Sequence, residues 1–179
     1  MMVLFASASE AGTFQILPNF SIVMFRAPYF EGFTLGTFSS FQGKMEIDEA
    51  QRSLTGLTAE IDLRSVNTMN FQRNLDLQGP DLFDTKSFPN AQFSSKRIEG
   101  NKVIGDLTLK GKTKEVTFEY QLADVFQDKA GRTIAGLTLQ GEINRKDFGI
   151  IYNRILEKNK PLMADQVKVE AEVAGLKLQ

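Results

Sequence analysis

The chain of 179 residues contains no Cys, no His and no Trp. Without His and Cys it lacks the commonest protein ligands of zinc and copper. The same absence excludes Ser-His-Asp triads and Cys–His nucleophiles. We therefore expect no metal, no cofactor and no catalytic residues. Without Cys there is no disulfide framework, so thiols do not indicate the redox compartment.

The chain also lacks an excess of charge of either sign and any long apolar run. The formal net charge is −1 and no basic stripe is present, so we expect no binding to nucleic acid. No stretch approaches the roughly 20 apolar residues that span a bilayer, which predicts a soluble or peripheral protein. What the chain does have is Phe, fifteen of them against three Tyr, which indicates a large interior with few polar groups.

The first twelve residues differ from the rest. Val3-Leu4-Phe5 followed by Ala6-Ser7-Ala8 is similar to the end of a secretory signal, although the apolar run is short and has no basic start. We predict a flexible N-terminus or signal remnant over residues 1–12 and a single domain over 13–179. A signal remnant favours a periplasmic or secreted protein, and a flexible cytoplasmic start is the alternative.

Period-2 alternation of apolar and polar residues predicts β-strands along most of the chain. Val116, Phe118, Tyr120 and Leu122, for example, alternate with polar residues after a tight Gly-Lys turn at 111–112. The segment 35–48 is long, and we expect it to be interrupted at Gly36 and Gly43. The predicted strands are 21–27, 35–48, 54–66, 91–99, 103–110, 113–123, 133–144 and 166–178.

Between residues 66 and 90 the pattern changes. Phe71 and Leu75 lie one helical turn apart, and Pro80 is typical of a helix start. We predict two short helices, 69–78 and 81–84, that cover one end of the sheet. Eight alternating strands with short connections predict an all-β fold, an extended antiparallel barrel with a short helical insertion. A barrel of this size is either filled by side chains or holds one small ligand, and the sequence leaves that open.

Two patterns indicate chemistry only weakly. Residues 105–113 end in Gly-Lys-Thr, but the spacing is not that of a phosphate-binding loop and two strands flank it, so a hairpin turn is favoured. Asp76, Asp81 and Asp84 do not have calcium-loop spacing, and helix caps or solvated charges are the favoured interpretation.

Six segments in order resemble the YceI-like family of bacterial polyisoprenoid-binding proteins, and the resemblance covers roughly residues 14–173. They are 21–25 (SIVMF), 36–43 (GTFSSFQG), 61–68 (IDLRSVNT), 81–95 (DLFD, FP and FSS), 105–116 (GDLTLKGKTKEV) and 144–149 (NRKDFG). Two departures concern histidines that the family often has. This chain has Tyr29-Phe30-Glu31 near one of them and Asp76 at the other, so any role of those histidines is in doubt here.

The resemblance implies a lipocalin-like barrel whose apolar tunnel binds and carries one isoprenoid or other long-chain amphiphilic lipid without catalysis. Contact with a membrane surface and dimer formation are compatible with this function and are left open. Arg73 is the candidate for an anionic headgroup. The candidate tunnel residues, each of which could equally be plain core, are Phe25, Phe38, Phe41, Ile61, Leu107, Phe118, Tyr120, Leu139 and Phe148.

Two other functions remain as alternatives. A filled barrel could act as a stress-related or interaction protein without bound lipid, and an enzyme acting on a lipid-like substrate would lack any recognisable catalytic dyad. For Arg145 and Asp147, in the segment that resembles R-x-D-F-G, a structural ion pair between a strand end and a loop is favoured over ligand contact.

Overall fold

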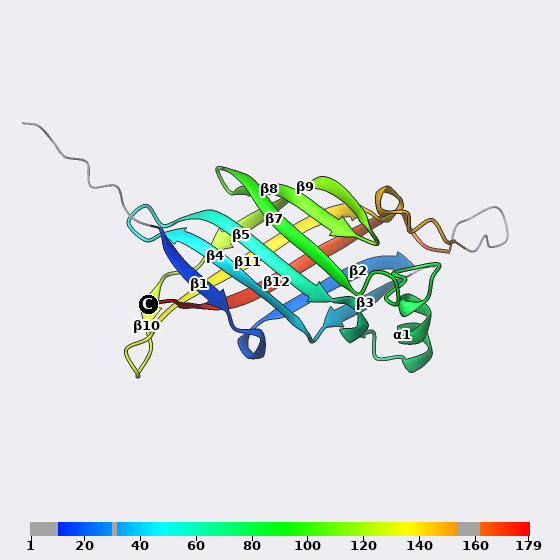
Figure 1. The fold of residues 1–179 in the computed structure, drawn as a ribbon, viewed down its shortest axis with the longest axis horizontal. Coiled ribbons are helices and arrows are strands. Elements are labelled where there is room, and N and C mark those ends of the chain that lie inside the picture. Colours follow the sequence, from blue (N-terminus) through cyan, green and yellow to red (C-terminus); the bar gives the residue numbers. More distant parts are fainter. Residues whose placement is uncertain (1–10, 30–31, 154–161) are drawn as a thin grey trace, which may run out of the picture.

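The computed structural model describes residues 11–29, 32–153 and 162–179, and these form an elongated antiparallel barrel (Figure 1). Most of the predicted N-terminal segment 1–12 lies outside the described residues, so its nature stays a prediction. The strands are β1 (Gly12–Ile16), β2 (Ile22–Tyr29), β3 (Gly32–Phe38), β4 (Phe41–Asp48), β5 (Ser53–Asp62), β6 (Val66–Asn67), β7 (Asn90–Glu99), β8 (Lys102–Leu109), β9 (Lys112–Leu122), β10 (Phe126–Gln127), β11 (Thr133–Asn144) and β12 (Gln166–Lys177). The helical elements are α1 (Phe71–Gln78) and the short 3-10 turns η1 (Pro18–Phe20), η2 (Leu63–Ser65) and η3 (Arg145–Phe148).

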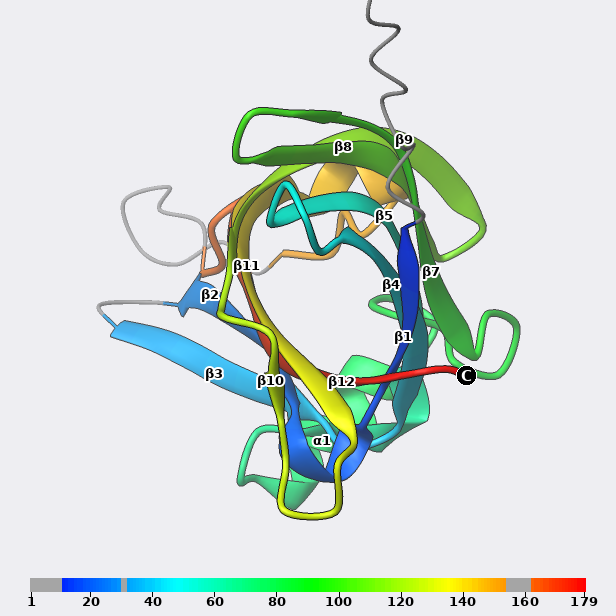
Figure 2. The same cartoon turned by 90° about the vertical axis from the view of Figure 1, so that its left-hand side faces the viewer.

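Eight strands close the barrel wall, in the order β1, β4, β5, β7, β8, β9, β11 and β12, with β12 returning to β1. The ladder between β11 and β12 runs from Ile134 opposite Leu176 to Asn144 opposite Gln166. Figure 2 looks along the resulting barrel. The predicted all-β fold, an antiparallel barrel of eight strands with a short helical insertion, is confirmed.

The wall is extended at one end by a hairpin. There β2 takes the place of β1 beside β12, with Ile22 opposite Glu172 and Arg26 opposite Lys168. The hairpin partner β3 then pairs with β6. Figure 1 places α1 at this end and the C-terminus at the other. We refer to the two as the α1 end and the terminal end.

The predicted strand 35–48 is divided, but not where the sequence indicated. The division between β3 and β4 falls at Ser39 and Ser40, whereas Gly36 and Gly43 lie inside the strands. Gly36 pairs with Phe25 across the hairpin, and a Cβ on Gly36 would overlap the Phe25 ring. This glycine therefore makes room for an inward aromatic side chain and does not interrupt the strand.

The hairpin of β8 and β9 turns at Lys110 and Gly111, one residue earlier than the predicted Gly-Lys turn. Both residues have positive φ, 49° and 69°, and Leu109 pairs directly with Lys112. Two left-handed residues in a two-residue loop are typical of the type I′ turn, whose twist matches that of the strands.

The insertion contains one helix, and the second predicted helix, 81–84, is wrong. Helix α1 begins after Asn70, whose side chain accepts a hydrogen bond from the Arg73 backbone N–H at 2.9 Å. After α1 the chain folds back on the end of the helix, since the Phe83 N–H donates to the Leu77 carbonyl at 2.9 Å. Asp84 has a φ of 51°, a left-handed conformation that does not continue a helix.

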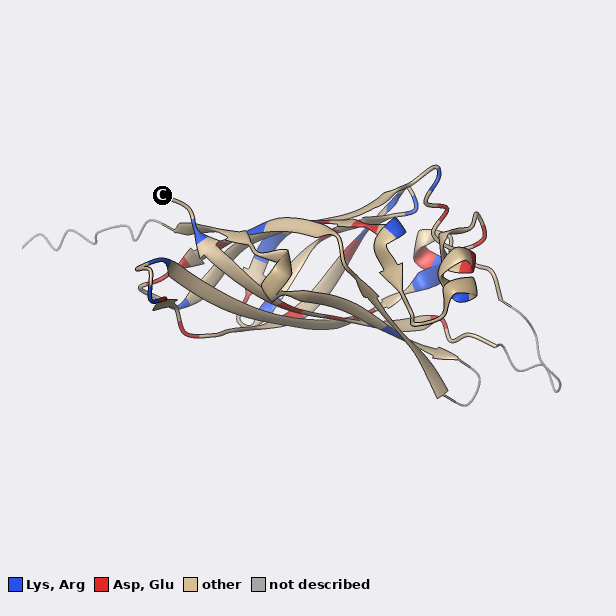
Figure 3. Ribbon diagram, turned by 90° about the horizontal axis from the view of Figure 1, so that it is seen from below, with Lys and Arg blue, Asp and Glu red and all other residues tan. Residues whose placement is uncertain are grey.

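The terminal end of the barrel is filled by side chains. Seven interior residues from five strands have exposed fractions between 0% and 2%, and we call them the plug: Phe14, Met45, Ile47, Leu54, Val103, Ala135 and Leu137. The outer wall is charged with both signs, and Figure 3 shows Lys and Arg among Asp and Glu along the strands and on α1.

The plug predicts where the fold is most sensitive to substitution. Replacing Phe14 with Ala should lower the free energy of unfolding by about 3–5 kcal/mol, because it removes a fully buried ring and leaves a cavity. Phe20→Ala is the matched control, since Phe20 is 76% exposed and its loss should cost less than about 0.5 kcal/mol. Urea denaturation of both variants measures the difference. Equal losses would contradict the assignment of the plug.

Candidate functional site

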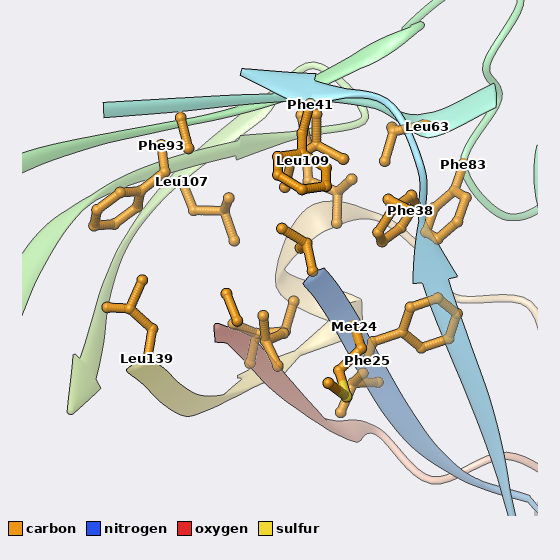
Figure 4. A pocket seen from close by; sticks show the side chains of 18 of the residues that line it. Met24, Phe25, Phe38, Phe41, Leu63, Phe83, Phe93, Leu107, Leu109 and Leu139 are labelled. Atoms are coloured by element: carbon orange, nitrogen blue, oxygen red, sulfur yellow. The ribbon is translucent and has the colours of Figure 1, made fainter. Parts of the chain in front are cut away.

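An apolar cavity of about 200 Å³ occupies the part of the barrel at the α1 end. Its wall combines strand residues with residues of the insertion, including Leu77 of α1. Figure 4 shows Phe38, Leu107 and Leu139, from three different strands, pointing into the same space. Every lining residue is apolar except Gln42 and Arg145.

Several inward-facing side chains around this cavity are less covered than those of the plug. Leu107, Leu139 and Val169 line the cavity and are only half-buried, whereas Met45 and Val103 of the plug are 0% exposed. An interior side chain stays accessible only where the packing leaves room beside it. The barrel is therefore filled at its terminal end and hollow at its α1 end.

Seven of the nine predicted tunnel residues line the cavity: Phe25, Phe38, Phe41, Ile61, Leu107, Phe118 and Leu139. Tyr120 does not, because it lies one inward position beyond Phe118 toward the terminal end of β9. Phe148 does not either, because it lies in η3, where strand alternation no longer applies, and is 1% exposed. Contact of any of the nine with a ligand stays a prediction.

Arg73 lies outside the cavity wall. Its guanidinium donates from Nε to Thr68 Oγ1 and from Nη2 to the Thr68 carbonyl, both at 2.9 Å. Asn74 bonds to the same threonine, with its Oδ1 accepting from the Thr68 N–H at 2.8 Å. The structure thus places Arg73 in the hydrogen-bonding network that holds the start of α1, and its role toward a headgroup stays a prediction.

Three lining residues of the insertion were not predicted from the sequence: Leu77, Leu82 and Phe83. The Phe83 ring packs against Phe25 and Phe38, with ring centroids 6.4 Å and 6.2 Å apart. Phe25 and Phe38 are themselves 5.7 Å apart, so the three rings form a cluster. The family resemblance could have indicated Leu82 and Phe83, because both belong to one of the resembling segments. Strand alternation could not, because it does not predict that a residue in a turn points into the barrel.

Arg145 organises the chain at the α1 end of the cavity, and its side chain is only 4% exposed. Its Nε donates to the Ala164 carbonyl at 2.9 Å, and its Nη1 donates to the carbonyls of Ile150 and Tyr152 at 2.6 Å and 2.8 Å. These bonds connect the segment after η3 with the segment before β12. A buried guanidinium held in this way is a structural element of the cavity mouth.

The ion pair expected between Arg145 and Asp147 forms with Asp165 instead. Arg145 Nη2 lies 3.1 Å from Asp165 Oδ1, and Lys146 Nζ lies 2.7 Å from Asp165 Oδ2. The hydrogen bond from Lys146 lowers the pKa of the Asp165 carboxyl below its ordinary value, and the charge of Arg145 lowers it further. The predicted tie between a strand end and a loop is present, with a different carboxylate.

Within residues 11–29, 32–153 and 162–179, no group of three or more His, Cys, Asp or Glu side chains is placed to hold a metal ion. In the same part of the chain no helix is both long and apolar enough to cross a membrane. Asp76, at one of the family's histidine positions, accepts a hydrogen bond from Gln72 at 3.0 Å.

Comparison with known proteins decides the family. The model of the YceI-like domain matches residues 14–174. This chain belongs to the YceI-like family. It is 36% identical to a UPF0312 protein of Staphylococcus aureus over 137 aligned residues. The aligned region covers 76% of this chain and 80% of the relative.

Solved structures agree with that assignment. BcnA of Burkholderia cenocepacia superposes with a TM-score of 0.73 at 26% identity, over 89% of this chain and 98% of that one. A YceI protein of Campylobacter jejuni gives 0.70 at 27% identity, over 80% and 85%. A polyisoprenoid binding domain of Saccharophagus degradans gives 0.67 at 16% identity, over 94% and 99%, and this likeness supports the fold alone.

The Asp165 pair predicts a local response to acid. A carboxyl whose pKa is lower in the folded protein than in the unfolded chain stabilises the fold above the unfolded pKa of about 3.9. That stabilisation is lost as the pH falls through the folded value. Asp165→Asn should remove this contribution, so its urea midpoint should fall less steeply than that of the wild type below about pH 4.

The control for this variant is Asp128→Asn, because Arg132 also lowers the pKa of Asp128, in the loop between β10 and β11. At neutral pH, amide exchange over residues 145–153 should become faster in Asp165→Asn and stay unchanged in Asp128→Asn. The same exchange rate in both variants would show that Asp165 does not hold the mouth.

Proposed function

We propose that this protein is a non-catalytic carrier that binds an isoprenoid or other long-chain amphiphilic lipid with its apolar chain in the cavity. The observation that carries the proposal is the hollow half of the barrel, lined almost entirely by apolar side chains. Family membership supports it, since the YceI-like resemblance implies lipid binding. The Saccharophagus degradans neighbour shares the architecture and is too distant in sequence to indicate the ligand.

The energetics fit a chain-bearing ligand. Each buried methylene contributes about 0.8 kcal/mol, so a hydrocarbon chain binds without polar contacts. The two polar lining residues do not change this character. Arg145 is engaged by carbonyls and Asp165, and the Gln42 amide donates to Glu60 at 3.3 Å. The described wall therefore offers no free acid or base to a substrate, which favours carriage over catalysis.

The insertion acts as a lid in this proposal. Leu77, Leu82 and Phe83 cover the cavity from outside the barrel wall, and Phe83 is anchored through the aromatic cluster with Phe25 and Phe38. Polar contacts within the segment, such as those of Arg73 with Thr68, lie apart from the cavity lining. Displacing Phe83 would open the cavity without breaking a strand ladder.

We propose further that the α1 end meets a membrane surface when the ligand is exchanged. Several exposed apolar side chains lie in elements at this end, among them Phe33, Phe71 and Ile151, which are 56%, 77% and 71% exposed. They lie at the end at which the insertion and the segment after η3 contribute to the cavity lining. A periplasmic or secreted location, with the cytoplasm as the alternative, fits a carrier that exchanges lipid in this way, and the oligomeric state is left open.

Introducing a charge into the wall tests the carrier. Leu107→Asp places a carboxylate in the cavity, at a cost of several kcal/mol against an alkyl chain, whereas water can solvate it once the chain has left. The variant should fold and lose its copurifying lipid. Its neighbour Thr108 lies on the outer face of β8, where it is half-buried and its hydroxyl bonds to that of Thr113, so Thr108→Asp is the matched control and should keep the lipid.

Mass spectrometry of a solvent extract reads out this experiment. Wild type and the control should release an amphiphile whose structure is chemically unchanged from the free lipid. Retention of lipid by a folded Leu107→Asp variant would contradict binding in this cavity. A wild-type extract with no lipid would favour the alternative of an interaction protein without a ligand.

The lid predicts a kinetic effect. Phe83→Ala removes the ring that anchors the insertion, so dissociation of a bound fluorescent fatty acid should become roughly tenfold faster. Phe71→Ala on α1 is the control, because Phe71 is 77% exposed and is not a cavity residue. Stopped-flow dilution measures both rates. Equal rates in the two variants and the wild type would show that the insertion does not gate the cavity.

A further inference from the structure

The cavity ends abruptly along the barrel axis. On four strands the cavity lining stops at one residue, and the next inward residue toward the terminal end is buried and does not line the cavity. These pairs are Ile16 and Phe14 on β1, Leu57 and Leu54 on β5, Leu139 and Leu137 on β11, and Val173 and Gly175 on β12. The boundary thus crosses four of the eight wall strands, β1, β5, β11 and β12, and forms a floor beneath this part of the cavity.

Met45 is the centre of this floor. It lies on β4 opposite Leu57, which lines the cavity, and next to Phe14 on β1. Its side chain crosses β1 to reach β12, because a Cβ added to Gly175 would overlap Met45 Cε and lie 3.0 Å from Phe14 Cβ. The missing side chain of Gly175 is what lets Met45 fill the barrel here.

The volume above the floor limits what can be enclosed. An apolar cavity of about 150 Å³ holds one benzene molecule, so about 200 Å³ encloses roughly eight to ten carbon atoms. That is the size of about two isoprene units or of a medium-length alkyl segment. A longer chain must leave its remainder at the mouth, in the lid or in the surrounding medium.

We infer that this protein encloses only about two isoprene units of its ligand and that Met45, seated on Gly175, sets this limit. The inference rests on the proposed function, since it specifies which part of a lipid the cavity takes. It predicts a carrier that selects lipids by the bulk of the short segment at the end of their chain. Its affinity should increase little when the chain becomes longer.

A series of isoprenoid alcohols tests the limit with wild-type protein. Geraniol, farnesol and geranylgeraniol each differ by one isoprene unit, and full burial of a further unit would tighten binding about a thousandfold. We expect farnesol to bind less than about tenfold more tightly than geraniol, and geranylgeraniol no more tightly than farnesol. Displacement of a fluorescent anilinonaphthalene probe gives the three dissociation constants.

Variants of the floor identify the residue that sets the limit. Met45→Ala removes three heavy atoms under the cavity, so the preference for farnesol over geraniol should increase about tenfold or more. Ile47→Ala is the matched control, a truncation of an equally buried plug residue that lies one inward position beyond Met45 on β4, away from the cavity. It should leave the preference unchanged. Met45→Val, a milder truncation of the same side chain, provides the same test if Met45→Ala does not fold.

The outcomes separate the two proposals. A wild type whose affinity increases about a thousandfold with each isoprene unit binds lipid but overturns the floor. An unchanged preference in both Met45→Ala and Met45→Val also overturns it. A wild type that binds none of the three alcohols overturns the proposed function and this inference with it.

Discussion

The closure of the barrel through the β11–β12 ladder is the constraint on which the other features depend. Eleven residue pairs along this ladder join the last two long strands and complete a wall of eight strands. A closed wall of that number leaves an interior just wide enough for one layer of side chains or one slender ligand. Each inward position must therefore either contribute to a packed core or border a space. This chain does both, with fully buried side chains at the terminal end and a cavity at the α1 end, where several of the lining side chains are only half-buried.

Most of the barrel was predictable because strand alternation is a local signal. The strands from β5 to β12 were predicted within a few residues, apart from the two-residue strands β6 and β10, and the inward faces were predicted well enough that seven of nine tunnel candidates line the cavity. What alternation cannot give is position along the barrel axis. Phe118 and Tyr120 share one face of one strand, yet only Phe118 reaches the cavity. That difference depends on the tilt and register of neighbouring strands, which no single strand encodes.

The less regular parts of the site were not predictable for a related reason. Phe83 reaches the interior from a turn stabilised by hydrogen bonds back to α1, and the partner of Arg145 lies twenty residues further along the chain. Gly36 was interpreted as an interruption because a glycine in a strand signals a bulge as often as a close contact. Only the position of the Phe25 ring distinguishes the two.

The division of the barrel into a filled and a hollow half reconciles two opposed requirements of a carrier. Such a protein must stay folded when empty, yet a cavity forfeits the packing that a core would supply. Here the plug stabilises the fold whether or not a ligand is present. At the mouth, the hydrogen bonds of Arg145 and its pair with Asp165 hold the chain beside the aromatic cluster. Ligand binding then adds to a stability that the empty barrel already has, by an amount that rises with the logarithm of ligand concentration above Kd, so release of the lipid leaves a folded barrel ready to bind again. A barrel hollow along its whole length would enclose a longer chain, but its stability would depend on the ligand that it has to release.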